Sequence, residues 1–313
     1  MPLHPTLEKM LDAAKAAGRP PLSAGDPAQA RAMVAGMRSA LGAGPQDVAV
    51  QVLAMAGRSG SIAGRLYRPP VEPLGLVVYV HGGGWVCGEM DDFDALSRLL
   101  AKRSGCALLL VDYRLAPEHP FPAGLYDVED TLLWAHAHGE ELLGARLPLI
   151  VSGDSAGANL GIAAVVACRD RVPVSLQSWF YPVTDCDMAR PSYLNFSAGM
   201  PLTQADMRWF FGHYAPEELW GDPAIAVLRS AALAGSPRTW VATAEYDVLR
   251  DEGEAYAQHL VALGVEVESH RVAGLTHGFA RMFNLIDTAR EAVERAADAM
   301  QAAANQFQLI KKK

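Results

Sequence analysis

Cysteine is scarce in this chain of 313 residues, and its four cysteines lie far apart. No two of them have the short paired spacing that zinc sites and redox motifs use. We therefore expect free thiols in a reducing, cytoplasmic setting. The four are Cys87, Cys106, Cys168 and Cys186.

Long apolar runs are absent as well. No stretch reaches the roughly 18 apolar residues that a membrane-spanning helix needs. Residues 1–17 include Glu8, Lys9, Asp12 and Lys15, and these charges interrupt the apolar segment that a signal peptide requires. The sequence therefore predicts no membrane span and a cytoplasmic location.

Basic residues are too few to give the chain a positive charge. The 27 Lys and Arg are outnumbered by 35 Asp and Glu, for a formal net charge of -8. A chain of this charge has no electrostatic attraction to nucleic acid or to an anionic membrane. The only basic run, Lys311–Lys313, is interpreted as a solvated tail.

Hydrophobic residues make up 50% of the chain, which is enough for a large core. Residues 48–55 and 61–69 alternate around a glycine turn and predict an antiparallel hairpin at one sheet edge. Short apolar runs then alternate with helical stretches, which predicts an α/β fold with a mostly parallel sheet covered on both faces. The expected strands are 75–81, 106–113, 147–152, 176–181, 239–244 and 265–272, and the expected helices are 93–104, 126–138, 156–170, 251–263 and 288–305.

Two segments depart from this alternation. Residues 1–45 contain two helical stretches, 5–17 and 26–41, separated by glycine and proline. Residues 182–237 are too long for an ordinary crossover between strands. We expect N-terminal cap helices in 1–45, a first core part in 46–185, a cap insertion in 186–236 and a second core part in 237–313. The aromatic residues of the insertion either cover a cleft or fill the core, and the two interpretations are compatible. They include Trp209, Phe210, Phe211, Tyr214 and Trp220.

The strongest local motif is Gly153-Asp154-Ser155-Ala156-Gly157, between an expected strand and an expected helix. A serine exposed at a sharp strand-to-helix turn needs small neighbours, because the flanking backbone approaches closely. The start of the helix also presents the Ala156 N–H to an anion forming beside the serine. The motif predicts Ser155 as a nucleophile, and the alternative is a glycine turn with an N-cap serine.

A second motif, His81-Gly82-Gly83-Gly84-Trp85, directly follows the strand expected over 75–81. Consecutive glycines let backbone N–H groups face a cavity, as an oxyanion hole requires. We expect Gly83 and Gly84 to be the donors and His81 to hold the loop through a structural hydrogen bond. The sequence has neither a P-loop nor a dinucleotide-binding fingerprint.

A serine nucleophile needs a base and a carboxylate that orients the base. In α/β folds with a serine turn of this kind, the chain order is nucleophile, acid and histidine. Asp247 follows the strand expected over 239–244, and His277 follows the last expected strand, so both positions fit this order. Asp251 is the rival for the acid, although its position suits the first turn of a helix. Asp154, beside the serine, is expected to make a supporting contact.

No metal site is expected from the histidines. His136 and His138 are two apart on an expected helix and therefore point to different faces.

Four motifs in register resemble those of the bacterial hormone-sensitive-lipase-like esterases, a family of the α/β-hydrolase superfamily. They are the 81–85 glycine motif, Asp112-Tyr113-Arg114-Leu115-Ala116-Pro117-Glu118, the 153–157 motif, and Asp247-Val248-Leu249-Arg250-Asp251-Glu252-Gly253 with His277-Gly278-Phe279 after it. The resemblance implies an eight-stranded α/β-hydrolase fold with a helical cap. It also implies that Arg114 and Glu118 pair with each other behind the oxyanion loop.

The activity implied is that of a serine carboxylesterase with the triad Ser155, His277 and Asp247, acting on short- to medium-chain acyl esters without a cofactor. The expected partner is a small-molecule ester, and a homodimer is expected from the family alone. Amide hydrolysis by the same groups stays open. A small-molecule receptor that has lost its histidine and a lipase with a large exposed apolar surface are less favoured.

Overall fold

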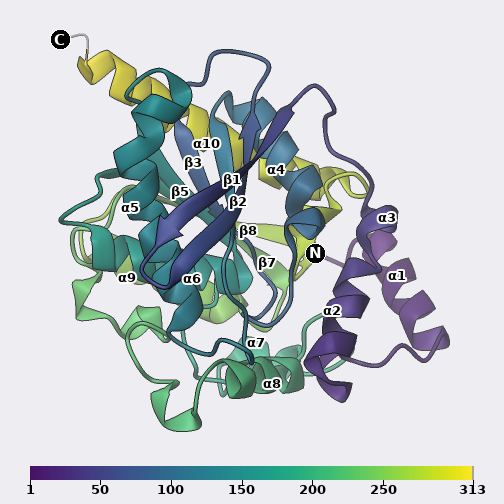
Figure 1. The fold of residues 1–313 in the computed structure, drawn as a ribbon. Helices are drawn as coiled ribbons and strands as arrows, with labels where there is room; N and C mark the ends of the chain where they lie inside the picture. Colours follow the sequence, from purple (N-terminus) through teal and green to yellow (C-terminus); the bar gives the residue numbers. More distant parts are fainter. Residues whose placement is uncertain (312–313) are drawn as a thin grey trace.

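The computed structural model describes residues 1–311, in which eight strands form one twisted sheet (Figure 1). The strand order is β1-β2-β4-β3-β5-β6-β7-β8. β1 pairs with β2, and β2 with β4, in antiparallel fashion, and all the other pairs are parallel. The predicted fold class and edge hairpin are therefore confirmed. The strands are β1 (Ala49–Gly57), β2 (Gly60–Arg68), β3 (Leu76–Val80), β4 (Ala107–Asp112), β5 (Leu149–Asp154), β6 (Val174–Phe180), β7 (Thr239–Tyr246) and β8 (Val267–Thr276).

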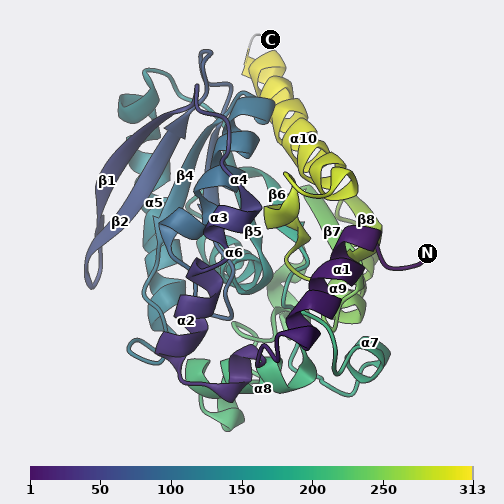
Figure 2. The ribbon, with the colours of Figure 1, turned by 90° about the vertical axis from the view of Figure 1, so that its right-hand side faces the viewer.

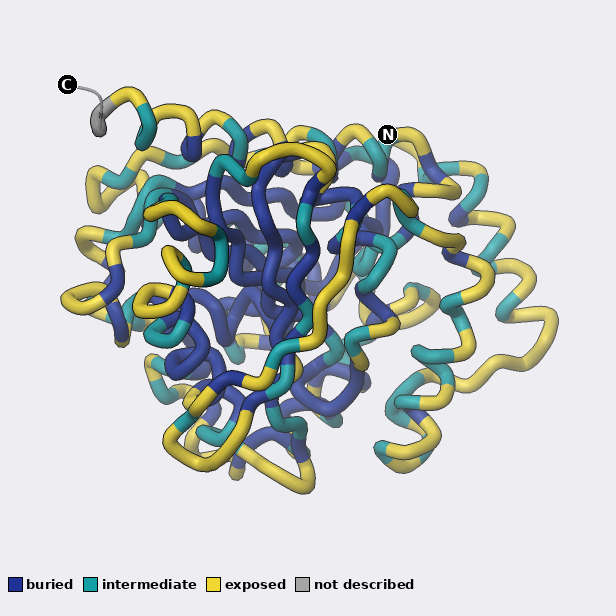
Figure 3. Tube along the Cα trace, turned by 45° about the horizontal axis from the view of Figure 1, so that its top comes forward, coloured by how far each residue is buried: buried dark blue, intermediate teal, exposed yellow. Residues whose placement is uncertain are grey.

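Helices cover both faces of the sheet. α4 (Met90–Ser104) and α10 (Asp287–Lys311) pack on one face, and α5 (Ala123–Leu143), α6 (Ser155–Cys168) and α9 (Arg250–Ala262) on the other (Figures 1 and 2). Along β3 the side chains alternate between two buried clusters, with Val78 and Val80 in one and Val77 and Tyr79 in the other. The central strands are buried on both sides (Figure 3), which explains why they are apolar throughout.

The N-terminal segment contains more helices than were expected. Besides α1 (Pro5–Ala16) and a short 3₁₀ turn, η1 (Leu22–Ala24), the stretch predicted as one helix over 26–41 forms α2 (Pro27–Ala35) and α3 (Arg38–Leu41). Gly36 ends α2, in keeping with the low helix propensity of glycine. Arg38 then bonds Asp92 and Glu89 of the α4 region, which holds α3 against the core.

The insertion between β6 and β7 lies at the same end of the sheet as this N-terminal segment. The Ser23 N–H donates to the Asp206 carboxylate (2.9 Å), and η1, which directly precedes α2, packs against α8. Of the five aromatic side chains named above for the insertion, four are buried and Trp209 is half-buried. Its elements are α7 (Pro191–Asn195), α8 (Gln204–Tyr214), η2 (Glu217–Leu219), η3 (Val227–Arg229) and η4 (Ala231–Leu233), and η5 (Phe279–Met282) follows β8.

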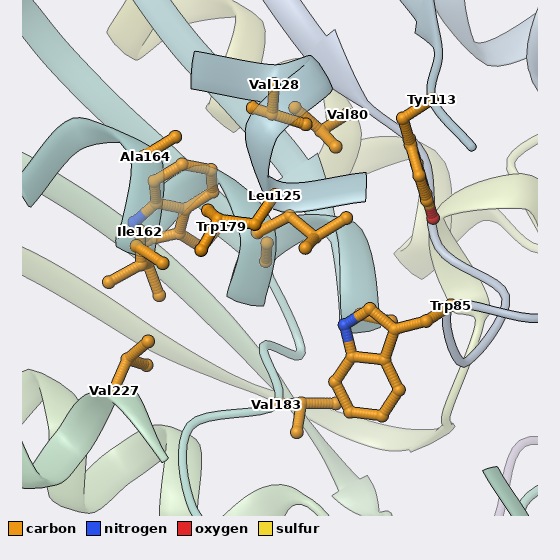
Figure 4. Close-up of a cluster of buried hydrophobic side chains, with 14 of the residues drawn as sticks. Val80, Trp85, Tyr113, Leu125, Val128, Ile162, Ala164, Trp179, Val183 and Val227 are labelled. Carbon is orange, nitrogen blue, oxygen red and sulfur yellow. The ribbon is translucent and has the colours of Figure 1, made fainter. Parts of the chain in front are cut away.

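Aromatic packing joins the insertion to the core. Trp85 stacks on Tyr214 with ring centroids 4.4 Å apart and planes 3° from parallel. Figure 4 shows Trp85 in the same buried cluster as Val80 of β3 and Val183 of the insertion. The insertion therefore fills part of the core.

The pairing of Arg114 with Glu118, implied by the resemblance, is wrong. The Arg114 guanidinium donates to the Asp127 carboxylate at 2.8 and 2.9 Å, and its backbone N–H donates there as well. Glu118 instead pairs with Arg31 of α2 at 2.6 Å. The Asp127 carboxylate is nearly buried, so a cation that bonds both of its oxygens stabilises its charge. Glu118 lies at the surface, within reach of Arg31 on α2.

Three further sequence predictions concern the cysteines, membrane-spanning helices and the C-terminal lysines. All four cysteines are free, as predicted. Within residues 1–311, no helix combines the length and the apolar character needed to cross a bilayer. Lys312 and Lys313, which belong to the predicted tail, lie outside the described residues.

A buried carboxyl group joins the start of the insertion to α9. Glu252 is fully buried, and its Oε1 accepts the N–H groups of Thr184 (2.7 Å) and Asp185 (3.2 Å). The Thr184 hydroxyl donates in turn to the Glu252 carbonyl (2.8 Å). Oε2 has no hydrogen-bond partner in the part of the chain that the structure describes. Burial raises the pKa of Glu252 to about 8.

Glu252→Gln is expected to change the pH dependence of stability. Because its folded pKa is raised, the stabilising effect of Glu252, complete below about pH 4.5, is lost as the pH rises toward about 8. The glutamine variant cannot ionise, so its unfolding free energy relative to wild type should increase across that window, by up to about 1.4 kcal/mol per pH unit. Urea unfolding at several pH values measures this difference.

Glu141→Gln is the matched control, because the Glu141 side chain is 88% exposed. This control should follow the wild-type curve at every pH. Parallel curves for Glu252→Gln and wild type would show that Glu252 is already ionised in the folded protein.

Candidate active site

The turn between β5 and α6 holds Ser155 in a strained backbone conformation. Its φ is +53°, in the left-handed region that residues with a side chain rarely adopt. The turn lies directly against the end of β3, where a Cβ on Gly157 would overlap the carbonyl oxygens of Val80 and His81. A Cβ on Gly153 would lie 2.6 Å from the Val80 oxygen. Both glycines of the motif are therefore required by close backbone contact.

Three predicted side chains meet at this turn. The Nε2 of His277 lies 3.0 Å from the Ser155 Oγ, and its Nδ1 lies 2.8 Å from Oδ2 of Asp247. The other oxygen of Asp247 accepts the Leu249 N–H at 3.0 Å. With Nδ1–H donating to the carboxylate, Nε2 is left free to accept the serine proton. Asp247 is 1% exposed and Ser155 6% exposed, so bulk water has little access to this chain of hydrogen bonds.

Strand register brings the acid and the histidine together. β8 continues four residues beyond the predicted end, and Thr276 pairs with Tyr246 of β7. Asp247 directly follows Tyr246, and His277 directly follows Thr276, so the two residues come side by side. Parallel strands end at the same edge of a sheet, which is where sites form in open α/β folds.

The rival carboxylate, Asp251, does not reach His277. Its Oδ2 accepts the Ser192 N–H (2.8 Å), and its Oδ1 pairs with Arg250 (2.9 Å). Asp251 lies in the first turn of α9, the position expected for it. Asp247 is thus the carboxylate that contacts the histidine.

The glycine loop after β3 is attached to the serine turn through Asp154. The buried Asp154 carboxylate accepts the Gly82 N–H (2.9 Å) and the Tyr79 hydroxyl (3.0 Å), and burial raises its pKa. This is the supporting contact expected of Asp154. It fixes the loop relative to the residue directly before the serine.

Within residues 1–311, three backbone N–H groups of the glycine loop and of the start of α6 have no protein acceptor. Gly83 and Gly84 have φ values of +126° and +61°, and their N–H groups donate to no protein acceptor among the described residues. Ala156, the second residue of α6, precedes the first N–H with an intrahelical partner. A Cβ on Gly84 would overlap the Phe210 ring, so α8 packs directly on this loop. Unsatisfied N–H groups of this kind suit a developing oxyanion.

His81 is buried away from the triad. Its ring stacks between Phe93 and Tyr113, with centroids 5.1 and 4.4 Å away, and its Nδ1 donates to the Gly82 carbonyl at 2.8 Å. Burial lowers the pKa of His81 to about 4, which keeps the ring neutral near pH 7. Its contacts are those of a residue that holds the loop.

Tyr181 also reaches the site, although the sequence did not single it out. Its ring centroid lies 4.6 Å from that of His277. A tyrosine at the end of a strand carries no motif that would have revealed this contact. For metal binding, no cluster of three or more His, Cys, Asp or Glu side chains suited to an ion occurs within residues 1–311.

Comparisons with known proteins identify relatives of this chain. A family model described as an alpha/beta hydrolase fold matches residues 77–281. The carboxylic ester hydrolase LipN of Mycobacterium tuberculosis is 38% identical over 298 residues, covering 90% of this chain and 78% of LipN. The ethyl acetate hydrolase of Pseudomonas putida is 34% identical over 317 residues, covering 96% of this chain and 99% of that protein.

A solved structure matches over almost the whole chain. The hyperthermophilic esterase from the archaeon Pyrobaculum calidifontis superposes with a TM-score of 0.90 and 35% identity, covering 97% of this chain and 99% of the other. The resemblance predicted from the four motifs is thereby confirmed. These matches show that the chain belongs to the hormone-sensitive-lipase-like family of α/β-hydrolase carboxylic ester hydrolases.

Proposed function

We propose that this chain is a serine carboxylesterase that hydrolyses short- to medium-chain acyl esters through Ser155, His277 and Asp247. The observation that supports this most directly is the position of His277, which lies within hydrogen-bond distance of both other side chains. A serine hydroxyl becomes a useful nucleophile when a neighbouring base accepts its proton and a carboxylate holds that base.

In the proposed mechanism His277 Nε2 takes the Ser155 proton as Oγ attacks the ester carbonyl carbon. The N–H groups of Gly83, Gly84 and Ala156 stabilise the resulting oxyanion. As the tetrahedral intermediate collapses, the histidine returns the proton to the departing alcohol, and an acyl group stays on the serine. Water then attacks the acyl-enzyme with His277 as base, and the carboxylic acid leaves.

The limit on chain length follows from how the serine is covered. We assign residues 1–45 and 186–236 to a cap over the site. Ser155 is 6% exposed, and Phe210 of the insertion lies against Gly84. An acyl group therefore has to fit beneath packed aromatic side chains, which favours short and medium chains. The ethyl acetate hydrolase relative is named for a short ester, which supports the same preference.

Ser155→Ala is expected to abolish hydrolysis of chromogenic esters, because it removes the attacking oxygen. Wild-type turnover, measured by absorbance over an acyl series from acetate to palmitate, should be highest on the short and medium chains. Faster turnover of palmitate than of butyrate would contradict the chain-length proposal. Residual activity of the variant near the wild-type rate would contradict the assignment of the nucleophile.

Asp247→Asn is expected to lower kcat by about 10⁴-fold, because an amide no longer holds the histidine with Nε2 free to accept a proton. Asp251→Asn is the matched control. It changes an acid four residues away that contacts Ser192 and Arg250 instead of the histidine, so its kcat should stay close to wild type. Steady-state kinetics on a butyrate ester measure kcat for both variants. A larger loss of kcat in Asp251→Asn than in Asp247→Asn would make Asp251 the acid.

Gly83→Ala is expected to lower kcat by about 10²- to 10³-fold, the loss typical of one missing oxyanion donor. The added Cβ would overlap the Cys87 carbonyl oxygen, so the loop must move. Gly199→Ala is the control. Gly199 also has a positive φ (+76°), but a Cβ there meets no atom within 4 Å, and the residue is in an exposed loop. Equal kinetic losses in the two variants would argue against a specific role of the Gly83 N–H.

A further inference from the structure

Tyr181 has an unusual backbone conformation for its residue type. It directly follows β6, its side chain is buried, and its φ is +37°. Bulky residues rarely adopt a positive φ. The next residue is Pro182, and a residue before proline is normally extended. Such outliers persist where the surrounding structure determines them, and they are concentrated at active sites.

Hydrogen bonds hold the chain around Tyr181 from both sides. The Tyr181 N–H donates to the Ala242 carbonyl of β7 at 2.6 Å. Two residues later the Val183 N–H donates to the carbonyl of Ser155 itself at 3.2 Å. The segment therefore connects β7, which leads to Asp247, with the turn that carries the nucleophile.

This conformation directs the Tyr181 ring against the catalytic histidine. The ring centroid lies 4.6 Å from that of His277, with the planes at 59°, and 4.9 Å from that of Phe279, at 78°. Among residues 1–311, Tyr181 is the aromatic side chain in ring contact with His277. Among the described residues, the nitrogens of His277 bond Asp247 and Ser155, and no hydrogen bond joins either of them to the Tyr181 hydroxyl. The ring, and not the hydroxyl, makes the contact with the imidazole.

The imidazole needs such a contact because its own torsion is soft. The χ2 angle of histidine has broad minima, so the rotamer alone does not set the ring plane. Nδ1 must face Asp247 while Nε2 faces Ser155, and both contacts depend on that plane. A packed ring beside the imidazole restricts its rotation without competing for either nitrogen.

We propose that Tyr181 is a positioning residue, whose ring holds the His277 imidazole in the one plane that serves Asp247 and Ser155 together. The proposal rests on the proposed function of the triad. Misplacing a reacting group by about 1 Å costs on the order of 10²-fold in rate. Loss of the ring should therefore lower kcat much more than it changes KM.

The test compares Tyr181→Leu with Tyr181→Phe, which keeps the ring and removes the hydroxyl. Phe180→Leu is the matched control, because Phe180 is the preceding residue, is equally buried, and packs on Tyr181, Trp240 and Phe279 rather than on His277. The measurements are kcat and KM on a butyrate ester and the low-field proton NMR signal of the His277–Asp247 hydrogen bond. That signal is assigned by its loss in Asp247→Asn.

Tyr181→Leu should lower kcat by about 10²-fold with little change in KM, and it should broaden or shift the low-field signal. In Tyr181→Phe and in Phe180→Leu, kcat and the low-field signal should both stay close to their wild-type values. Tyr181→Met has a flexible side chain that fills irregular space, and it provides a second variant without the ring if the leucine variant does not fold.

Wild-type kcat and an unchanged signal in the leucine or methionine variant would overturn the proposal. If Tyr181→Phe lost as much kcat as Tyr181→Leu, the effect would belong to the hydroxyl. If Phe180→Leu lost as much, the effect would belong to general packing. Either result would reject positioning by the ring. Failure of the proposed function can be told apart from failure of the Tyr181 proposal. In the first case the wild type would lack ester turnover, while the NMR signal would still report on the position of the imidazole.

Discussion

The β5–α6 turn touches the end of β3 so closely that no side chain fits between them. Glycine at 157 is required because any Cβ would overlap the carbonyl oxygens of Val80 and His81. Through this contact the serine turn and the glycine loop form one rigid unit, which Asp154 reinforces through the Gly82 N–H. The left-handed conformation of Ser155 is maintained by the same packing. The position of Ser155 relative to the glycine loop therefore depends on a close backbone contact.

The other half of the site depends on the sheet. β7 and β8 end in register, and the residues that follow Tyr246 and Thr276 are Asp247 and His277. Their relative position is thus determined by a strand ladder, while the serine turn belongs to a different pair of strands. Residues 181–183 connect the two halves, since they bond β7 at one end and the Ser155 carbonyl at the other. A site assembled in this way keeps its geometry as long as the sheet is intact.

Much of this arrangement could be predicted because the chemistry imposes local sequence requirements. Glycines flank the serine and form the loop since backbone contact excludes side chains there, and Ser155, Asp247 and His277 follow strands whose ends converge at one edge of the sheet. Features set by tertiary neighbours could not be predicted in this way. The partners of Arg114 and Glu118 are Asp127 and Arg31, and no spacing indicates that choice. The end of β8 was placed too early because its apolar run stops near Gly274, whereas pairing with β7 extends the strand to Thr276. Tyr181 was missed because a left-handed residue before proline has no sequence signal.

The central claim is that Ser155 carries the acyl group during turnover. It is tested most directly by quenching the enzyme in acid while it turns over a butyrate ester, followed by digestion and mass spectrometry of the peptides. The account predicts a butyryl adduct on the peptide containing Ser155, located on that serine, and no such adduct in Ser155→Ala. Sustained turnover with the adduct on a different residue, or unchanged turnover in the alanine variant, would contradict it.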